Sequence, residues 1–206
     1  MTNKILNNDL KFNIACLVMG RDKIYAFIKK ITPIYWYIRP STKFVLKNYQ
    51  KNNLICVEIG VDYGLNAKTL LKLLSIKKLY LVDPYYDELD SVSGDKRFKD
   101  AQRFLKKYND KIEFIRKTSM DAINDIPDDI DFLYIDGSHD YKQVKKDIEL
   151  YYPKVKQGGV IGGHDFWAST NDVCKAVLEF VDEKNLKLYG KITDWWIIKK
   201  TEDVNV

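Results

Sequence analysis

The sequence predicts an α/β domain whose central sheet is mostly parallel and is closed at one edge by an antiparallel hairpin. From residue 54 onward, short apolar runs alternate with segments of helical periodicity, as in strands linked by crossover helices. The apolar runs are nearly continuous, which is typical of strands buried on both faces. No helix separates the last two runs, so they predict the hairpin. Together with five parallel strands, it completes a sheet of seven strands.

The bounds of each element follow from the turn-forming and polar residues that separate the apolar runs. Parallel strands are predicted at 54–60, 78–84, 112–118, 130–137 and 158–166, and the hairpin strands at 186–189 and 194–200. Helices are predicted at 66–75, 101–108, 119–126, 141–155 and 171–185, and a polar loop at 85–100. Asn66 and Asp140 are suited to cap the helices that they precede. Asp147 and Glu149 are expected on a solvated helix face.

Bulk composition supports one such domain at 52–206 with an N-terminal appendage at 1–51. The chain has 206 residues, of which 46% are hydrophobic and 31% charged, enough for a sizeable core. No apolar run approaches the roughly 18 residues of a membrane span. The three cysteines are scattered, without a CxxC pair. This pattern predicts reduced thiols and a cytoplasmic location.

The appendage at 1–51 differs in charge from the rest of the chain. It holds ten Lys/Arg and two Asp, whereas 52–206 holds 24 Lys/Arg and 27 Asp/Glu. Five aromatic residues lie between Tyr25 and Tyr37, and prolines at 33 and 40 break the segment into short helices. We expect a basic, aromatic helical cap. It would pack on the main domain, form a dimer contact, or lie on a membrane surface. The charges are dispersed, so an ordinary solvated surface remains an alternative, and nucleic acid is not expected as a partner.

The ends of the first two strands predict a nucleotide-like cofactor. In open parallel sheets, ligands bind beyond the carboxyl ends of the strands. The first strand ends in EIGVDYG, which contains Glu58, Gly60 and Gly64, and the second ends in Asp83. Glycines let the backbone turn close to a ligand, and an acid at the end of the second strand suits a ribose diol.

The charge of Asp62 helps to identify the class of cofactor that binds. It occupies the place where a dinucleotide loop has its middle glycine, and its charge would repel a pyrophosphate. An adenosyl cofactor with a cationic amino group and a sulfonium suits both Asp62 and Glu58. A nicotinamide-dependent oxidoreductase is the first alternative. The second is a non-catalytic cofactor-binding adaptor that acts through residues 1–51.

Both histidines of the chain stand beside carboxylates at predicted strand ends. They occur in IDGSHDY, which contains Asp136 and His139, and in GGHDF, which contains His164 and Asp165. One such motif alone would be an ordinary Asp-Gly turn. Because neighbouring strand ends converge on one cleft, the repeated pattern favours a functional site. A histidine is suited to remove a proton near neutral pH.

The segments VEIGVDYG, LYLVDPY, IDGSHDY and DIELYYPKVKQGGVIGGHDF together resemble the class I S-adenosylmethionine-dependent methyltransferases, which have a Rossmann-like fold. More narrowly, they resemble the branch with macrocin O-methyltransferase and cephalosporin hydroxylase. The resemblance covers about 54–199 and leaves 1–51 uncovered. It implies transfer of a methyl group from S-adenosylmethionine to a hydroxyl of a small molecule, namely a sugar or a similar polyol or phenol.

The resemblance also implies a role for each motif residue. Glu58, Gly60 and Gly64 would hold the methionine part of the cofactor, Asp83 the ribose, and Ser119 and Met120 the adenine. Asp136 would be a metal ligand at the reacting centre and His139 the general base. His164 and Asp165 would be an adjacent pair of metal ligands.

His164 departs from the family pattern, in which an oxygen ligand is usual at this position. Mg²⁺ prefers oxygen ligands, whereas imidazole suits Mn²⁺ and softer ions better. Three alternatives follow: two carboxylates alone hold Mg²⁺, the metal is softer, or no metal binds and His164 hydrogen-bonds the substrate or Asp136.

Overall fold

The computed structural model describes residues 38–49, 51–87, 92–167 and 171–200. Most of the expected N-terminal cap, including the aromatic group between Tyr25 and Tyr37, therefore lies outside the described residues. From Arg39 onward the chain forms one compact unit, so this unit begins before the boundary expected at residue 52.

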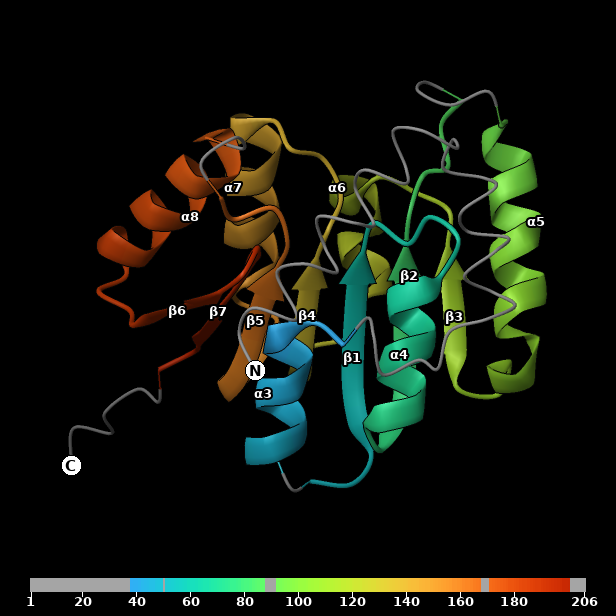
Figure 1. The fold of residues 1–206 in the computed structure, drawn as a ribbon, viewed down its shortest axis with the longest axis horizontal. Coiled ribbons are helices and arrows are strands. Elements are labelled where there is room, and N and C mark those ends of the chain that lie inside the picture. The colour runs from blue at the N-terminus through green and yellow to red at the C-terminus, as the bar shows by residue number, and fades with distance from the viewer. Residues whose placement is uncertain (1–37, 50, 88–91, 168–170, 201–206) are drawn as a thin grey trace. The chain divides into compact units, whose positions relative to one another are not determined.

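The sheet has the predicted seven strands and the predicted mixture of directions (Figure 1). The strands are β1 (Leu54–Ile59), β2 (Ile76–Val82), β3 (Ile112–Ile115), β4 (Ile130–Ile135), β5 (Val155–Gly163), β6 (Leu188–Lys191) and β7 (Asp194–Ile198). Their order is β3-β2-β1-β4-β5-β7-β6. The strands β1 to β5 are parallel to one another, and β7 runs antiparallel to both β5 and β6. The fold class predicted from the sequence is confirmed.

Helices cover both faces of the sheet, and each face has its own apolar core (Figure 1). One face carries α3 (Pro40–Asn48), α4 (Leu65–Leu73) and α5 (Gly94–Leu105). The other carries α6 (Ser119–Ala122), α7 (Tyr141–Tyr151) and α8 (Asn171–Glu183). Short 3₁₀ turns follow at Lys106–Tyr108 and Ile123–Asp125. In the described part of the chain, no helix has the length and apolar character needed to cross a membrane.

Three local predictions about helices were wrong and two are confirmed, one of which is the exposed position of Glu149. Helix α4 is capped by Gly64, and Asn66 is instead buried inside its first turn. Helix α5 begins at Gly94, earlier than the predicted start at 101, because Ser93 caps it and accepts from the Lys96 amide. Asp147 is buried, not solvated. Asp140 does cap α7, through hydrogen bonds from two backbone amides.

Helix α3 is attached to the sheet through a buried carboxylate. Asp194 of β7 accepts hydrogen bonds from the Ser41 amide at 2.8 Å and from the Tyr134 hydroxyl at 2.8 Å. The Ser41 amide lies in the first turn of α3, where a negative charge is favourable. Burial nevertheless raises the pKa of Asp194, although Arg39 and these hydrogen bonds oppose the shift. This attachment holds Arg39, which immediately precedes α3, next to the carboxyl edge of the sheet.

Candidate active site at the ends of β1, β4 and β5

Three strands end side by side at the carboxyl edge of the sheet. Ile59 of β1 is in register with Ile135 of β4, which is in register with Gly163 of β5. The residues that follow therefore lie together, and the first two are Gly60 and Asp136. Because the chain leaves β1 toward β2 and returns at β4 on the other side, β1 and β4 flank the point where the strand order reverses. Open sheets of this kind bind ligands at that point.

Gly60 lets the first of these strand ends approach the second. It has φ of 84°, and a Cβ built on it would lie 2.1 Å from the Asp136 carbonyl oxygen. No other residue could take this place without displacing the backbone of Asp136. Gly64, with φ of 77°, then turns the chain into α4. The two glycines predicted for the cofactor loop are thus required by its shape.

Glu58 is a buried acid directly below this loop. Its side chain is 1% exposed, and its Oε1 accepts a hydrogen bond from Asn66 Nδ2 at 3.0 Å. Its Oε2 has no hydrogen-bond partner within the described part of the chain. Burial raises the pKa of Glu58 to about 8, although the Asn66 hydrogen bond opposes the shift. The site therefore contains an acid with one oxygen that accepts no hydrogen bond from the described residues, and burial outweighs the charge of Arg39 in setting its pKa.

Asp83 holds the loop in place. Its Oδ2 accepts from the amides of Val61 and Asp62, both at 2.9 Å, and its Oδ1 accepts from the Tyr85 amide at 2.8 Å. Asp62 has a positive φ of 48° and pairs with Arg97 at 3.5 Å. The carboxylate expected to bind ribose thus already has three donors, all of which are backbone groups of the β1 and β2 ends.

Ser119 and Met120 lie after β3, in helix α6, as the sequence placed them. Ser119 is buried, and its hydroxyl donates to Asp147 and accepts from Gln143 Nε2. Burial raises the pKa of Asp147, and the hydrogen bonds from Ser119 and Gln143 oppose that shift. Met120 is one of the exposed large apolar side chains. Of the two residues predicted to contact adenine, Met120 presents its side chain outward, while the Ser119 hydroxyl ties α6 to α7.

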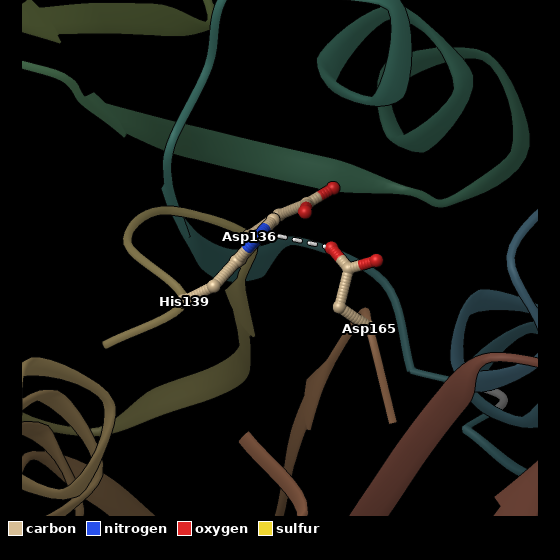
Figure 2. A group of neighbouring side chains, drawn as sticks. All are labelled: Asp136, His139 and Asp165. Atoms are coloured by element: carbon tan, nitrogen blue, oxygen red, sulfur yellow. Dashed lines mark ion pairs between the residues drawn. The ribbon is translucent and has the colours of Figure 1, made fainter. Parts of the chain in front are cut away.

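Asp136, His139 and Asp165 come together in the loops after β4 and β5 (Figure 2). One possible ligand atom from each lies within 4.8 Å of the other two. His139 Nε2 is 2.8 Å from Asp165 Oδ2, and the His139 side chain is 53% exposed. A small pocket is lined by these three residues and His164, with Val144, Val173 and Trp195 among its apolar walls. The structure therefore combines an accessible imidazole with two partly buried carboxylates.

His164 makes contacts through both ring nitrogens. Its Nδ1 lies 3.0 Å from Asp165 Oδ2 and 3.8 Å from Asp136 Oδ1. Its Nε2 lies 2.7 Å from the Thr193 hydroxyl. The candidate cluster above is completed by His139, but His164 Nδ1 also faces both carboxylates. The three alternatives stated for His164 therefore stay predictions.

The surroundings of Asp165 stabilise its charged form. Burial alone would raise its pKa, but the hydrogen bonds and charges of His139 and His164 outweigh that effect. They hold the pKa of Asp165 well below its usual range. Its backbone has a positive φ of 57°, which is uncommon for a residue other than glycine.

Arg39 is a residue of this site that sequence reasoning missed. Its Nη2 lies 3.2 Å from Asp136 Oδ2, and the side chains are 11% and 22% exposed. The sequence offered one signal, since Arg39 precedes Pro40 and a proline favours the first turn of a helix. Helix α3 packs on β5 and β7, which nothing in the sequence indicated. Its residues were therefore predicted to belong to the separate N-terminal cap at 1–51.

Comparison with solved proteins identifies the class of fold. A protein assigned as a methyltransferase from Streptococcus mutans, in complex with SAH, has a TM-score of 0.61 and 17% identity, with 79% of this chain and 98% of that chain covered. A protein assigned as a caffeoyl-CoA O-methyltransferase from Staphylococcus aureus has a TM-score of 0.62 and 14% identity, with 95% and 100% covered. At these identities the likeness establishes the fold alone. It is the class I methyltransferase fold.

The sequence identifies the family. Residues 57–166, more than half of the chain, match the family described as "Methyltransferase domain". The chain belongs to this family. The uncharacterized protein R132 of Acanthamoeba polyphaga mimivirus is 29% identical over 123 residues. The match covers 57% of this chain and 54% of R132, so the chain spans about half the length of that relative.

Proposed function

We propose that this methyltransferase transfers the methyl group of S-adenosylmethionine to a hydroxyl oxygen of a small molecule, and that His139 removes the hydroxyl proton. The observation that carries the proposal is the placement of His139 and the two carboxylates directly beside the glycine loop. Gly60 contacts the backbone of Asp136, so the loop suited to a cofactor and the cluster suited to an acceptor share one boundary.

The β1 loop fits the cofactor through charge and shape. S-adenosylmethionine, when bound, supplies a methyl group on a positively charged sulfur, and it also carries an α-amino group. Glu58 has a buried oxygen without a partner in the described part of the chain, which a cationic group would complete. Gly60 and Gly64 let the loop backbone lie close to the methionine part. We assign the ribose to Asp83, which retains capacity to accept further hydrogen bonds, since each carboxylate oxygen accepts about two.

Ser119 and Met120, the two residues predicted to contact the adenine, are assigned different roles. The Ser119 hydroxyl is occupied by Asp147 and Gln143. We therefore assign the face of the adenine to the exposed Met120 side chain, with Ser119 contributing through its backbone and through the position of α6.

His139 suits the role of general base because it is accessible and oriented. A neutral alcohol is a poor nucleophile, and a positioned base contributes about 10²–10⁴-fold to rate. Asp165 orients the ring and stabilises the imidazolium that forms when the ring takes a proton. The single positive charge of Arg39 lies against Asp136, which limits the negative charge that faces the acceptor.

A divalent ion is a second part of the proposal. Asp136 and Asp165 would hold it, and it would lower the pKa of a bound hydroxyl. Two carboxylates with imidazole close by suit Mn²⁺ at least as well as Mg²⁺. The donor set fits such an ion, although Arg39 competes with it for Asp136.

The acceptor class rests on the resemblance and on one neighbour. The Staphylococcus aureus protein is assigned to O-methylation, and the branch that the motifs resemble includes a sugar O-methyltransferase. We therefore propose a sugar or a similar polyol or phenol. Membership of the methyltransferase family favours this function over the nicotinamide alternative.

The experiment combines calorimetry with product detection. S-adenosylhomocysteine should bind and NAD should not. With S-adenosylmethionine and a panel of monosaccharides, nucleotide sugars and catechols, mass spectrometry should detect a product heavier by one methyl group. His139→Ala should lower turnover at least about 100-fold while S-adenosylhomocysteine still binds. Lys142→Ala, an exposed change in the same loop–helix region, serves as the control. Unchanged turnover in His139→Ala would refute the assignment of the base, and binding of NAD alone would refute the cofactor.

A further inference from the structure

The strand ends around the cofactor loop carry several negative charges. Glu58 belongs to β1, Asp83 follows β2 and Asp136 follows β4. The amino-acid part of S-adenosylmethionine has an α-carboxylate as well as an α-amino group. The amino group suits Glu58, but these acids would repel the carboxylate unless a cation of the protein faces it. A cofactor of this kind therefore requires a cation beside the loop.

Arg39 acts on the acids of both neighbouring strand ends. Its Nη2 lies 3.2 Å from Asp136 Oδ2, whereas His164 Nδ1 faces the other oxygen, Oδ1, at 3.8 Å. Burial raises the pKa of Glu58, and the charge of Arg39 is one of the effects that lower it. The guanidinium and the buried carboxylate of Glu58 thus face the same region of the strand ends.

The backbone at Arg39 is held in place before any ligand binds. The Ser41 amide donates to Asp194 at 2.8 Å, and the Lys43 amide donates to the Arg39 carbonyl at 3.0 Å. Arg39 has φ of −57° and ψ of 140°, the extended conformation that a following proline favours. Its side chain is 11% exposed. A guanidinium held in this way loses little freedom on binding an anion, and its five donors can serve two carboxylates.

We propose that Arg39 binds the α-carboxylate of the cofactor and thereby selects S-adenosylmethionine over its decarboxylated form. Glu58 and Arg39 then hold the two ends of one zwitterion, the amino group at the acid and the carboxylate at the guanidinium. Pairs of arginine and carboxylate are among the strong charge-assisted hydrogen bonds. The inference rests on the cofactor of the proposed function, and it is independent of the acceptor and of the base.

Arg97 is the other arginine beside this loop, and its contacts give it a different role. Its Nη1 lies 3.5 Å from Asp62 Oδ1, and its Nη2 donates to the Tyr86 carbonyl. Arg97 therefore joins the loop after β1 to the segment after β2. A change at Arg97 should affect every ligand that uses the loop, whereas a change at Arg39 should affect only ligands with a carboxylate.

Calorimetry on the full-length protein with two ligands tests the proposal. The ligands are S-adenosylhomocysteine and its decarboxylated analogue, which lacks only the α-carboxylate. The wild-type protein should bind S-adenosylhomocysteine about 10- to 100-fold more tightly, as expected for a hydrogen bond to a charged group. Arg39→Gln should remove most of this preference by weakening S-adenosylhomocysteine alone. The analogue should bind Arg39→Gln as tightly as wild type, which also shows that the variant is folded.

Three further variants separate recognition of the carboxylate from a structural role. Arg39→Lys keeps the charge without the planar donors and should keep part of the preference. Glu58→Gln should weaken both ligands, because both have the amino group. Arg103→Gln is the matched control, since this side chain is 77% exposed on α5, and it should change neither affinity.

Three results would overturn the proposal. The first is a wild-type protein that binds the two ligands equally. The second is an equal loss of both ligands in Arg39→Gln, which would make Arg39 a structural residue. The third is a selective loss of S-adenosylhomocysteine in Arg97→Gln with none in Arg39→Gln.

The inference and the proposed function fail separately. A selective effect of Arg39→Gln in a protein that methylates no hydroxyl would support the inference and count against the proposed acceptor. Methyl transfer by Arg39→Gln with an unchanged KM for S-adenosylmethionine would do the reverse. A wild-type protein that binds neither ligand would refute the cofactor, and both proposals with it.

Discussion

The ends of β1 and β5 each carry a carboxylate, and their surroundings shift the two pKa values in opposite directions. Glu58 is fully buried, has one hydrogen-bond donor, and has a pKa raised to about 8. Asp165 is also largely buried, but two imidazoles donate to it and hold its pKa well below the usual range. Burial favours the neutral acid in both places. The neighbours differ: Asp136 and Asp83 raise the pKa of Glu58 further, whereas the hydrogen bonds and charges of the two imidazoles lower that of Asp165.

This difference indicates what each strand end still requires. Asp165 has two donors within the protein, which suits the orienting role proposed for it. Glu58 has an oxygen without a partner in the described part of the chain, so its charged form awaits a cation from outside. Pairs of acids with pKa values pushed apart are typical of sites that divide binding and proton transfer between them.

The largest expected effect is that of Asp165→Asn on turnover. An amide at this position cannot accept from two imidazoles as an ionised carboxylate does, and it cannot stabilise imidazolium. We expect turnover to fall about 100-fold, with affinity for S-adenosylhomocysteine within about twofold of wild type. Steady-state kinetics and calorimetry check this. The control is Asp172→Asn, an exposed acid in the first turn of α8. If both changes lowered turnover equally, Asp165 would have no special role.

Glu58→Gln should show the opposite pattern. The change keeps the shape of the side chain and an oxygen for Asn66, but it removes the charge that a cationic cofactor group would meet. A hydrogen bond to a charged group contributes about 1.5–3 kcal/mol, so affinity for S-adenosylmethionine should fall about 10- to 100-fold. Turnover at saturating cofactor should change less. Glu149→Gln, on the exposed face of α7, is the matched control. Wild-type affinity in Glu58→Gln would remove Glu58 from the cofactor site.

The pKa of Glu58 also predicts how stability varies with pH when no cofactor is present. The folded protein retains a proton up to about pH 8, whereas an unfolded glutamate releases it near pH 4.3. The folded state therefore binds more protons in this window, and the free energy of unfolding falls as the pH rises through it. Glu58→Gln should flatten this decline by about 1 kcal/mol or more between pH 5 and pH 8. Urea unfolding at several pH values measures the slope. Equal slopes for Glu58→Gln and wild type would show that Glu58 ionises normally.

Much of the fold was predictable because the strands are short, apolar and separated by clear helices. The order of the elements, the hairpin, and the convergence of Asp136 with Asp165 all follow from rules for parallel sheets. Asn66 was wrongly predicted as the helix cap because a glycine in the left-handed conformation can also precede a helix. The side-chain amide of Asn66 instead donates to the buried Glu58. The start of α5 was missed because its first residues lie in a polar stretch without apolar periodicity.

The contacts of the site were less predictable than its position. Arg39, Thr193 and Asp147 act through partners that are distant in sequence, and no local pattern indicates such pairs. Asp147 is polar and lies on a charged helix, so its position in the sequence indicated a solvated face. It is buried because Ser119 and Gln143 supply the donors that a buried carboxylate requires.

The smallest expected effect concerns the divalent ion at the β5 end. Starting from chelator-treated protein, Mn²⁺ at several times its Kd should stabilise by about 1 kcal/mol, and a chain of this size should then melt about 2–4 °C higher. Asp136→Asn should remove the shift, because it deletes one of the two carboxylates at the site. His164→Gln should retain most of it, since both ring nitrogens of His164 already contact Asp165 and Thr193. If His164→Gln removed the shift as completely as Asp136→Asn, the imidazole would be a ligand. The ligand atom would be Nδ1, which faces both carboxylates, so its contact with Asp165 would rearrange when the ion binds while Nε2 stays on the Thr193 hydroxyl.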